Sequence, residues 1–213
     1  MKIIKSFVAA ALLAVSTSAM AQFTNTSTSG ATSTNVETDG WSTFYVQYNP
    51  ISIDPDEGSG YDFTGFSVGV NRAFSISSST PLYLETGLGV QYAMYDKNEE
   101  KINIFSAKVP VNLVYNWQLP NSSISIAPFA GVGLRYNISG KLEFDDYDED
   151  YDVFNDDDMD GNAWKRFQIG WQIGANARFN NKFLVGVSYG KDFSEIAEGA
   201  KVGTTSITVG YCF

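Results

Sequence analysis

The sequence contains no histidine and a single cysteine, Cys212. Histidine is the usual general base near neutral pH, because its ordinary pKa lies close to the working pH of most enzymes. Its absence closes the commonest hydrolytic route, and we expect no enzyme activity. One cysteine also cannot form a disulfide within the chain.

Long apolar runs are missing as well. The longest, residues 7–15, is too short to cross a bilayer as a helix, which needs ~20 apolar residues. It follows the basic residues Lys2 and Lys5 and precedes the small-residue sequence Ala19-Met20-Ala21. This arrangement predicts a secretory signal peptide over residues 1–21, with cleavage before Gln22.

Basic residues are scarce, with 14 Lys and Arg against 24 Asp and Glu and a formal net charge of −10. Nucleic-acid binding needs a basic surface, so we expect no nucleic-acid partner. Residues 22–40 are rich in Ser, Thr, Asn and Gly and predict a flexible leader. Residues 41–213 remain for one domain of modest size.

Within this domain, apolar and polar residues alternate with the period of two that is typical of half-buried β-strands. The connections between strands alternate between short turns, near residues 77–81, 118–122 and 180–181, and longer or charged loops. We therefore expect eight antiparallel strands in an up-and-down barrel with its short turns at one end. The predicted strands are 41–49, 62–74, 82–94, 102–117, 123–138, 164–179, 183–189 and 204–213.

The last strand places four apolar side chains on one face and ends on an aromatic residue. These residues are Ile207, Val209, Tyr211 and Phe213. With the signal peptide, this strand resembles the closing strand of the small bacterial outer-membrane β-barrels of the OmpX/OmpA type, which are often labelled porin-like. The resemblance implies an all-β, eight-stranded antiparallel transmembrane barrel in the outer membrane of a Gram-negative bacterium. It also implies that outer-membrane lipid surrounds the barrel and that the barrel-assembly machinery reads these four residues.

A soluble lipocalin-like barrel is the rival fold, because its strands alternate in the same way. Its apolar faces would point inward around a ligand. Here the other face of the strands mixes glycine with charged and amide side chains, which makes a poor apolar cavity. The uninterrupted apolar face suits lipid better.

Five charged residues fall on the predicted inner face: Glu85, Lys108, Arg135, Arg166 and Arg178. Either these charges pair and fill the lumen, with Glu85 and Lys108 as one couple, or they line a narrow anion-preferring pore. We favour the filled lumen, because the interior of an eight-stranded barrel is just wide enough for side chains.

The loop before the sixth predicted strand carries a dense acidic sequence over residues 145–161. Asp156, Asp158, Asp160 and Gly161 match the opening of a calcium-binding loop, but the twelfth position is Phe167 where such loops carry glutamate. The loop is therefore either solvated or a weak Ca²⁺ site, and we expect no other cofactor. We also expect Arg135 and Arg166 near the outer mouth to hold it as a lid.

These features predict an outer-membrane barrel with a structural or cell-surface interaction role that displays an acidic extracellular loop. Its partner would then be an extracellular ligand or a host surface. The alternative is a narrow porin-like channel for small solutes.

Overall fold

The computed structural model describes residues 40–55, 60–97, 100–144 and 150–213. The predicted signal peptide, all of the predicted leader except Gly40, and residues 145–149 of the acidic sequence lie outside these ranges. Their assignments stay predictions. In the described part of the chain, no helix is long and apolar enough to cross a membrane.

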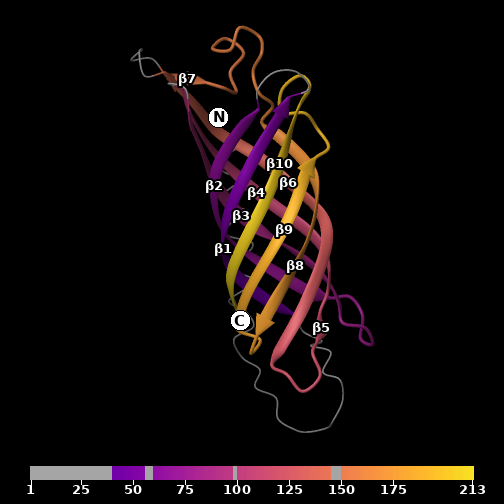
Figure 1. Cartoon of the computed structure of the whole chain (residues 1–213). Helices are drawn as coiled ribbons and strands as arrows, with labels where there is room; N and C mark the ends of the chain where they lie inside the picture. The colour runs from indigo at the N-terminus through magenta and orange to yellow at the C-terminus, as the bar shows by residue number, and fades with distance from the viewer. Residues whose placement is uncertain (1–39, 56–59, 98–99, 145–149) are drawn as a thin grey trace. The chain divides into compact units, whose positions relative to one another are not determined.

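Eight long strands form one closed antiparallel sheet, and this confirms the predicted fold (Figure 1). Neighbours in sequence are neighbours in the sheet, β10 returns to pair with β1, and pairing of β4 with β6 closes the barrel. Two short strands, β5 (Trp117–Gln118) and β7 (Asp150–Asp152), extend the pairing of β6 at its ends. The long strands are β1 (Trp41–Pro55), β2 (Tyr61–Ser75), β3 (Leu82–Lys97), β4 (Glu100–Tyr115), β6 (Ile124–Phe144), β8 (Phe167–Phe179), β9 (Phe183–Asp192) and β10 (Ala200–Cys212).

Most strands extend further than the sequence pattern predicted, mainly toward the end that carries the longer loops. We call this the loop end, and the opposite end, with both the start of β1 and the last residue of β10, the turn end. At the loop end, Lys97 pairs directly with Glu100, so only two residues separate these partners in the connection near residues 96–101, which we grouped with the longer or charged loops. The exception is β8, which begins at Phe167 and leaves residues 164–166 in the preceding loop.

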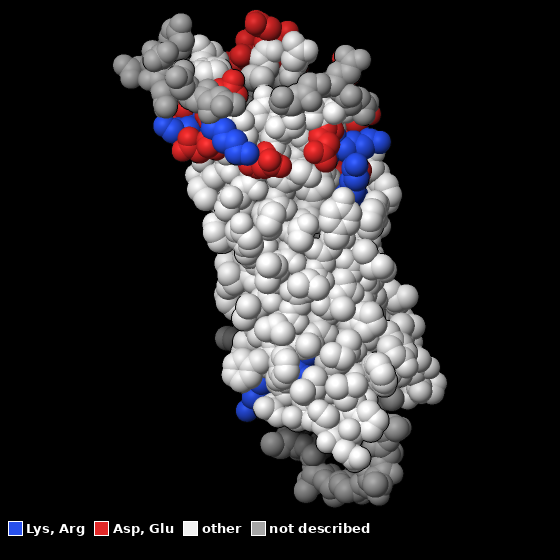
Figure 2. Space-filling model, in the orientation of Figure 1, with Lys and Arg blue, Asp and Glu red and all other residues white. Residues whose placement is uncertain are grey.

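In the middle of the barrel, the prediction that the apolar face of each strand points outward is confirmed. Apolar side chains of the predicted outer face are exposed, among them Phe44, Val46, Leu84, Val90, Ile207, Val209, Tyr211 and Phe213. On the face in Figure 2, charged residues gather in a belt at the loop end, and a broad zone without charge lies beneath it. This zone is where lipid tails would contact the barrel.

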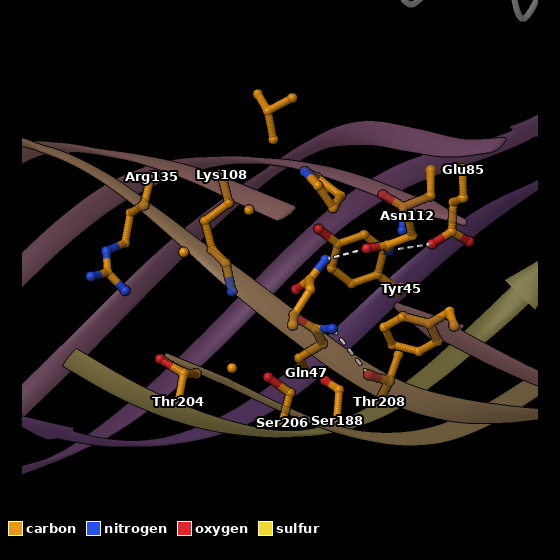
Figure 3. A pocket seen from close by; sticks show the side chains of 18 of the residues that line it. Tyr45, Gln47, Glu85, Lys108, Asn112, Arg135, Ser188, Thr204, Ser206 and Thr208 are labelled. Atoms are coloured by element: carbon orange, nitrogen blue, oxygen red, sulfur yellow. Dashed lines mark hydrogen bonds between the residues drawn. The ribbon is translucent and has the colours of Figure 1, made fainter. Parts of the chain in front are cut away.

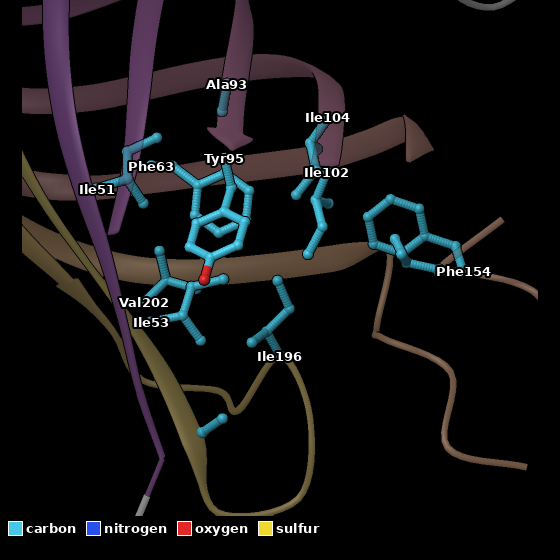
Figure 4. Packing of buried hydrophobic residues seen from close by; sticks show 12 residues of the cluster. Ile51, Ile53, Phe63, Ala93, Tyr95, Ile102, Ile104, Phe154, Ile196 and Val202 are labelled. Atoms are coloured by element: carbon cyan, nitrogen blue, oxygen red, sulfur yellow. The ribbon is translucent and has the colours of Figure 1, made fainter. Parts of the chain in front are cut away.

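Near the loop end the apolar residues change sides. Along β1, Phe44 and Val46 point outward, whereas Ile51 and Ile53 have the opposite parity and are buried inside. The same change occurs on the neighbouring strands and produces an apolar plug, the loop-end cluster (Figure 4). Its buried members are Ile51, Ile53, Phe63, Ala93, Tyr95, Ile102, Ile104, Val153, Phe154, Ile196, Ala200 and Val202. Beyond the lipid zone the outer surface faces water, so the apolar side chains must turn inward to be buried.

A second apolar group, the turn-end cluster, closes the other end of the lumen. Its buried members are Trp41, Ala73, Tyr83, Val114, Ala127, Leu184 and Cys212. Trp41 and Tyr83 pack edge to face with ring centroids 4.6 Å apart. The guanidinium of Arg178 lies 3.9 Å from the Trp41 ring centroid, and this cation–π contact places a buried charge against an aromatic face.

Glycines on the inner face make room for long side chains from adjacent strands. Tyr45 on β1 lies over Gly69 and Gly89, and a Cβ atom at those positions would come within 2.5 Å and 2.3 Å of its hydroxyl. Gly133, in contrast, has open space, with the nearest atom, Gln172 Oε1, 3.9 Å from such a Cβ. Glycine and long polar residues therefore alternate on this face because a long side chain of one strand occupies the space above a glycine of another strand.

We expect Gly89→Ala to destabilise the barrel by about 1–3 kcal/mol, because the added methyl group displaces the Tyr45 hydroxyl. Gly133→Ala is the matched control and should be neutral or slightly stabilising. Urea unfolding of both variants in lipid vesicles measures the difference. Tyr45→Phe should restore much of the stability lost in Gly89→Ala, and equal effects of the two alanines would refute this packing explanation.

Candidate functional site

A polar chamber lies in the lumen between the two apolar clusters (Figure 3). Its volume is about 110 Å³, and residues from all eight long strands line it. Side chains that face it include Tyr45, Glu85, Lys108, Arg135, Gln172 and Ser206. Three of the five charges that we predicted for the inner face therefore meet in one place.

Glu85 does not form the expected couple with Lys108. The β3–β4 register pairs Glu85 with Asn112 and places Lys108 opposite Gly89, four residues further along β3. Asn112 Nδ2 donates to Glu85 Oε1 at 3.0 Å, and Gln172 Nε2 donates to Asn112 Oδ1 at 2.6 Å. The carboxylate is thus buried in an amide network at the side of the chamber nearer the turn end.

Arg135 finds its partner on β9, two strands away. Its Nη2 donates to Asp192 Oδ2 in an ion pair of which both side chains are largely buried. The sequence interpretation missed Asp192 because it ended the strand at residue 189. The signal was available in the alternation, since Asp192 has the same inward parity as Leu184 and Ser188.

The other two predicted lumen charges lie elsewhere. Arg178 is fully buried at the turn end beneath Trp41. Arg166 precedes β8 and is part of the loop, where Nη1 donates to Ile138 O at 2.9 Å and Nη2 to Asp152 Oδ2 at 2.9 Å. Its placement on the inner face was therefore wrong, because β8 begins one residue later.

The described part of the acidic loop, residues 150–166, is folded onto the barrel mouth. Val153 and Phe154 are buried in the loop-end cluster, and the ring of Phe154 lies 5.0 Å from the Arg166 guanidinium carbon. Trp164 packs edge to face against Tyr61, with ring centroids 6.0 Å apart, and the backbone N–H of Trp164 donates to Val153 O at 2.7 Å. Each fully buried apolar side chain of this kind stabilises the docked loop by ~1.5–3 kcal/mol.

Arg166 binds a carboxylate of the loop, Asp152, as the predicted lid requires, whereas Arg135 forms its ion pair inside the lumen with Asp192. The calcium hypothesis receives no support from the geometry. Asp158 Oδ2 accepts the backbone N–H of Asp152, Gly161 N donates to Asp156 O, and no group of three or more metal-ligating side chains forms anywhere in the described ranges. Calcium binding by Asp156, Asp158 and Asp160 stays a prediction.

The strand that carried the resemblance is built as expected. Ile207, Val209, Tyr211 and Phe213 all point outward, and β10 completes the barrel by pairing with β1 and β9. A family model described as outer membrane protein beta-barrel domain matches residues 21–194 of the chain. The chain belongs to this family. Its location in the bacterial outer membrane follows from that membership.

Solved structures of other outer-membrane barrels are similar to this chain. The outer membrane enzyme PagL is 15% identical, with a TM-score of 0.50 over 79% of this chain and 97% of PagL. Ail, the attachment invasion locus protein of Yersinia pestis, is 17% identical, with a TM-score of 0.44 over 82% of this chain and 99% of Ail. Neisserial surface protein A is 12% identical, with a TM-score of 0.48 over 81% and 97% of the two chains. No curated protein matches the sequence.

These identities are low, so the likeness to solved structures concerns the fold alone. The likeness to PagL therefore carries no role over to this chain, since one fold can host unrelated functions. The role must be argued from the residues of this outer-membrane barrel.

We expect Arg166→Ala to loosen residues 150–166, because it removes hydrogen bonds to the backbone of β6 and to Asp152. Limited proteolysis of the folded barrel should then cut this loop several-fold faster. Arg135→Ala is the matched control, since Arg135 pairs with Asp192, and it should leave the cutting rate unchanged. Equal acceleration in both variants would contradict the assignment of Arg166 as the residue that anchors the loop.

Proposed function

We propose that this protein is a surface-exposed outer-membrane barrel whose folded loop end presents an acidic interaction surface. The observation that carries this proposal is the docking of residues 150–166 on the loop-end cluster. A loop that is already ordered loses little conformational entropy when a partner binds.

The charge of the loop indicates the class of partner. Several carboxylates of the docked segment are exposed while its apolar side chains point into the barrel. The exposed carboxylates belong to Asp150, Asp156, Asp157, Asp158 and Asp160. Complementary charge steers association and selects partners, so a cationic segment of an extracellular protein or a basic host surface suits this face.

A narrow channel is the second candidate, because the polar chamber lies in the lumen. Against it, the chamber lies between two apolar clusters, and the Trp41–Tyr83 pair and Arg178 fill the turn end. An ion that crossed would have to pass apolar side chains that offer it no replacement for water. We infer that the barrel does not conduct in its resting state.

We also infer that the protein has no catalytic role. The chain has no histidine, and three of the charged groups in its lumen are engaged in structural contacts, Arg135 with Asp192 and Glu85 with Asn112.

The interaction surface is tested by replacing Asp156, Asp157, Asp158 and Asp160 with asparagine. Binding of a fluorescent decalysine peptide to the barrel in detergent micelles should weaken about tenfold at low salt, because exposed charge contacts are each worth ~0.2–1 kcal/mol. The control neutralises four carboxylates outside the loop, Asp54, Asp62, Asp96 and Glu143. Equal weakening in both variants would mean that only net charge matters, and the proposed surface would be wrong.

Conductance in planar lipid bilayers tests the channel. The unaltered barrel should give no stepwise current, because both ends of its lumen are filled. The double variant Trp41→Ala with Tyr83→Ala thins the turn-end cluster alone and should stay closed as well, because the loop-end cluster remains in place. Current steps of equal size and frequency in both proteins would favour the channel over the surface role.

A further inference from the structure

Two cations stand directly opposite each other inside the barrel. Lys108 on β4 and Arg135 on β6 are register partners, and both face the polar chamber. Like charges at directly opposed positions of a sheet repel each other and destabilise the pair. The effect is stronger in a lumen than at a wet surface, because side chains replace most of the water that would screen it.

The carboxylates of the chamber form an ion pair with only one of the two cations. Asp192 forms its ion pair with Arg135. Glu85 accepts its hydrogen bond from Asn112, and the β3–β4 register keeps it away from Lys108. Across the described ranges, no carboxylate lies within ion-pair distance of the Lys108 ammonium group. A charge taken out of bulk water is costly unless an opposite charge or hydrogen-bond acceptors accompany it.

The opposite wall of the chamber carries hydroxyl groups. Thr204 and Ser206 on β10 and Ser188 on β9 face Lys108 across the cavity (Figure 3). Ser206 Oγ accepts a hydrogen bond from Asn49 Nδ2 at 2.7 Å, so its own O–H remains available to donate. Arg135 likewise has N–H groups beyond the Nη2 that binds Asp192.

Together these groups surround the cavity with positive charge and hydrogen-bond donors on two sides. A volume of about 110 Å³ exceeds the room that a single water needs, which is roughly 10–15 Å³ on a comparable measure. A halide or nitrate ion therefore fits, and it would supply the negative charge that Lys108 lacks.

We propose that the lumen chamber binds one small inorganic anion, of the size of chloride, between the Lys108 ammonium group and the hydroxyls of Thr204 and Ser206. The Arg135 guanidinium provides additional positive potential. The bound anion is a structural ion of the closed lumen, and its site is independent of the acidic surface proposed above.

The test uses the full-length barrel, purified as it is made by the cell, in a non-ionic detergent. Its melting temperature is followed by tryptophan fluorescence while sodium chloride replaces sodium gluconate at constant ionic strength, since gluconate is too large for the chamber. The unaltered protein should show a saturable rise of about 3 °C or more, as expected for a ligand that binds only the folded state. Lys108→Met keeps most of the side-chain volume but removes the charge, and it should abolish the rise.

Two further variants keep the test decisive. Thr204→Val removes one hydroxyl without changing the shape of the side chain, and it should raise the half-saturating chloride concentration about fivefold, the effect of one hydrogen bond. Lys97→Met removes a lysine from the outer charged belt and should respond to chloride as the unaltered protein does. Chloride dependence that persists in Lys108→Met, or its absence from the unaltered barrel, would overturn the proposal. If Lys108→Met fails to fold, the proposal would still be overturned by an unchanged half-saturating chloride concentration in Thr204→Val.

Discussion

Closure of the sheet is the constraint on which the rest of this structure depends. Lipid tails offer no hydrogen bonds, so every backbone N–H and C=O group in the spanning zone must be paired within the protein. The pairings of β4 with β6 and of β1 with β10 meet this requirement by leaving no free edge among the eight long strands. Closure at this strand number also fixes a narrow interior, and the narrowness decides what the inner side chains can do.

The narrow interior explains the composition of the inner face. Long polar residues such as Tyr45 lie across glycines of the neighbouring strands, because a Cβ at Gly69 or Gly89 would collide with the Tyr45 hydroxyl. Charges that share so small a space must be compensated there. Asp192 does this for Arg135, and the amide of Asn112 binds Glu85, whereas Lys108 relies on the hydroxyl-lined cavity that faces it.

At the loop end, beyond the lipid-facing zone, apolar and polar residues exchange the faces of the barrel that they occupy. In the middle, apolar residues point outward and polar residues inward, as a membrane requires. At the loop end the outer surface carries charges such as the exposed Lys97–Asp62 pair, and the interior becomes an apolar core like that of a soluble protein. This core is what allows Val153, Phe154 and Trp164 to dock the acidic loop, so the external surface is held by the same strands that cross the membrane.

The sequence by itself determined the strand number and the outward faces, and it carried the family resemblance. The outward faces follow from the sequence because successive side chains in a strand point to opposite sides of the sheet. Phe44, Val46, Ile207 and Val209 point outward as their parity requires. The same parity marks Ile51 and Ile53 as inward, where the loop-end cluster buries them. Only the tertiary structure decided which charges meet. The register separates Glu85 from Lys108, and a strand that begins at Phe167 moves Arg166 out of the lumen. The registers of β8 with β6 and β9 bring Asp192 near Arg135. These outcomes depend on how far each strand slides past its neighbours and on what lies across the lumen, and neither is encoded in the alternation of a single strand.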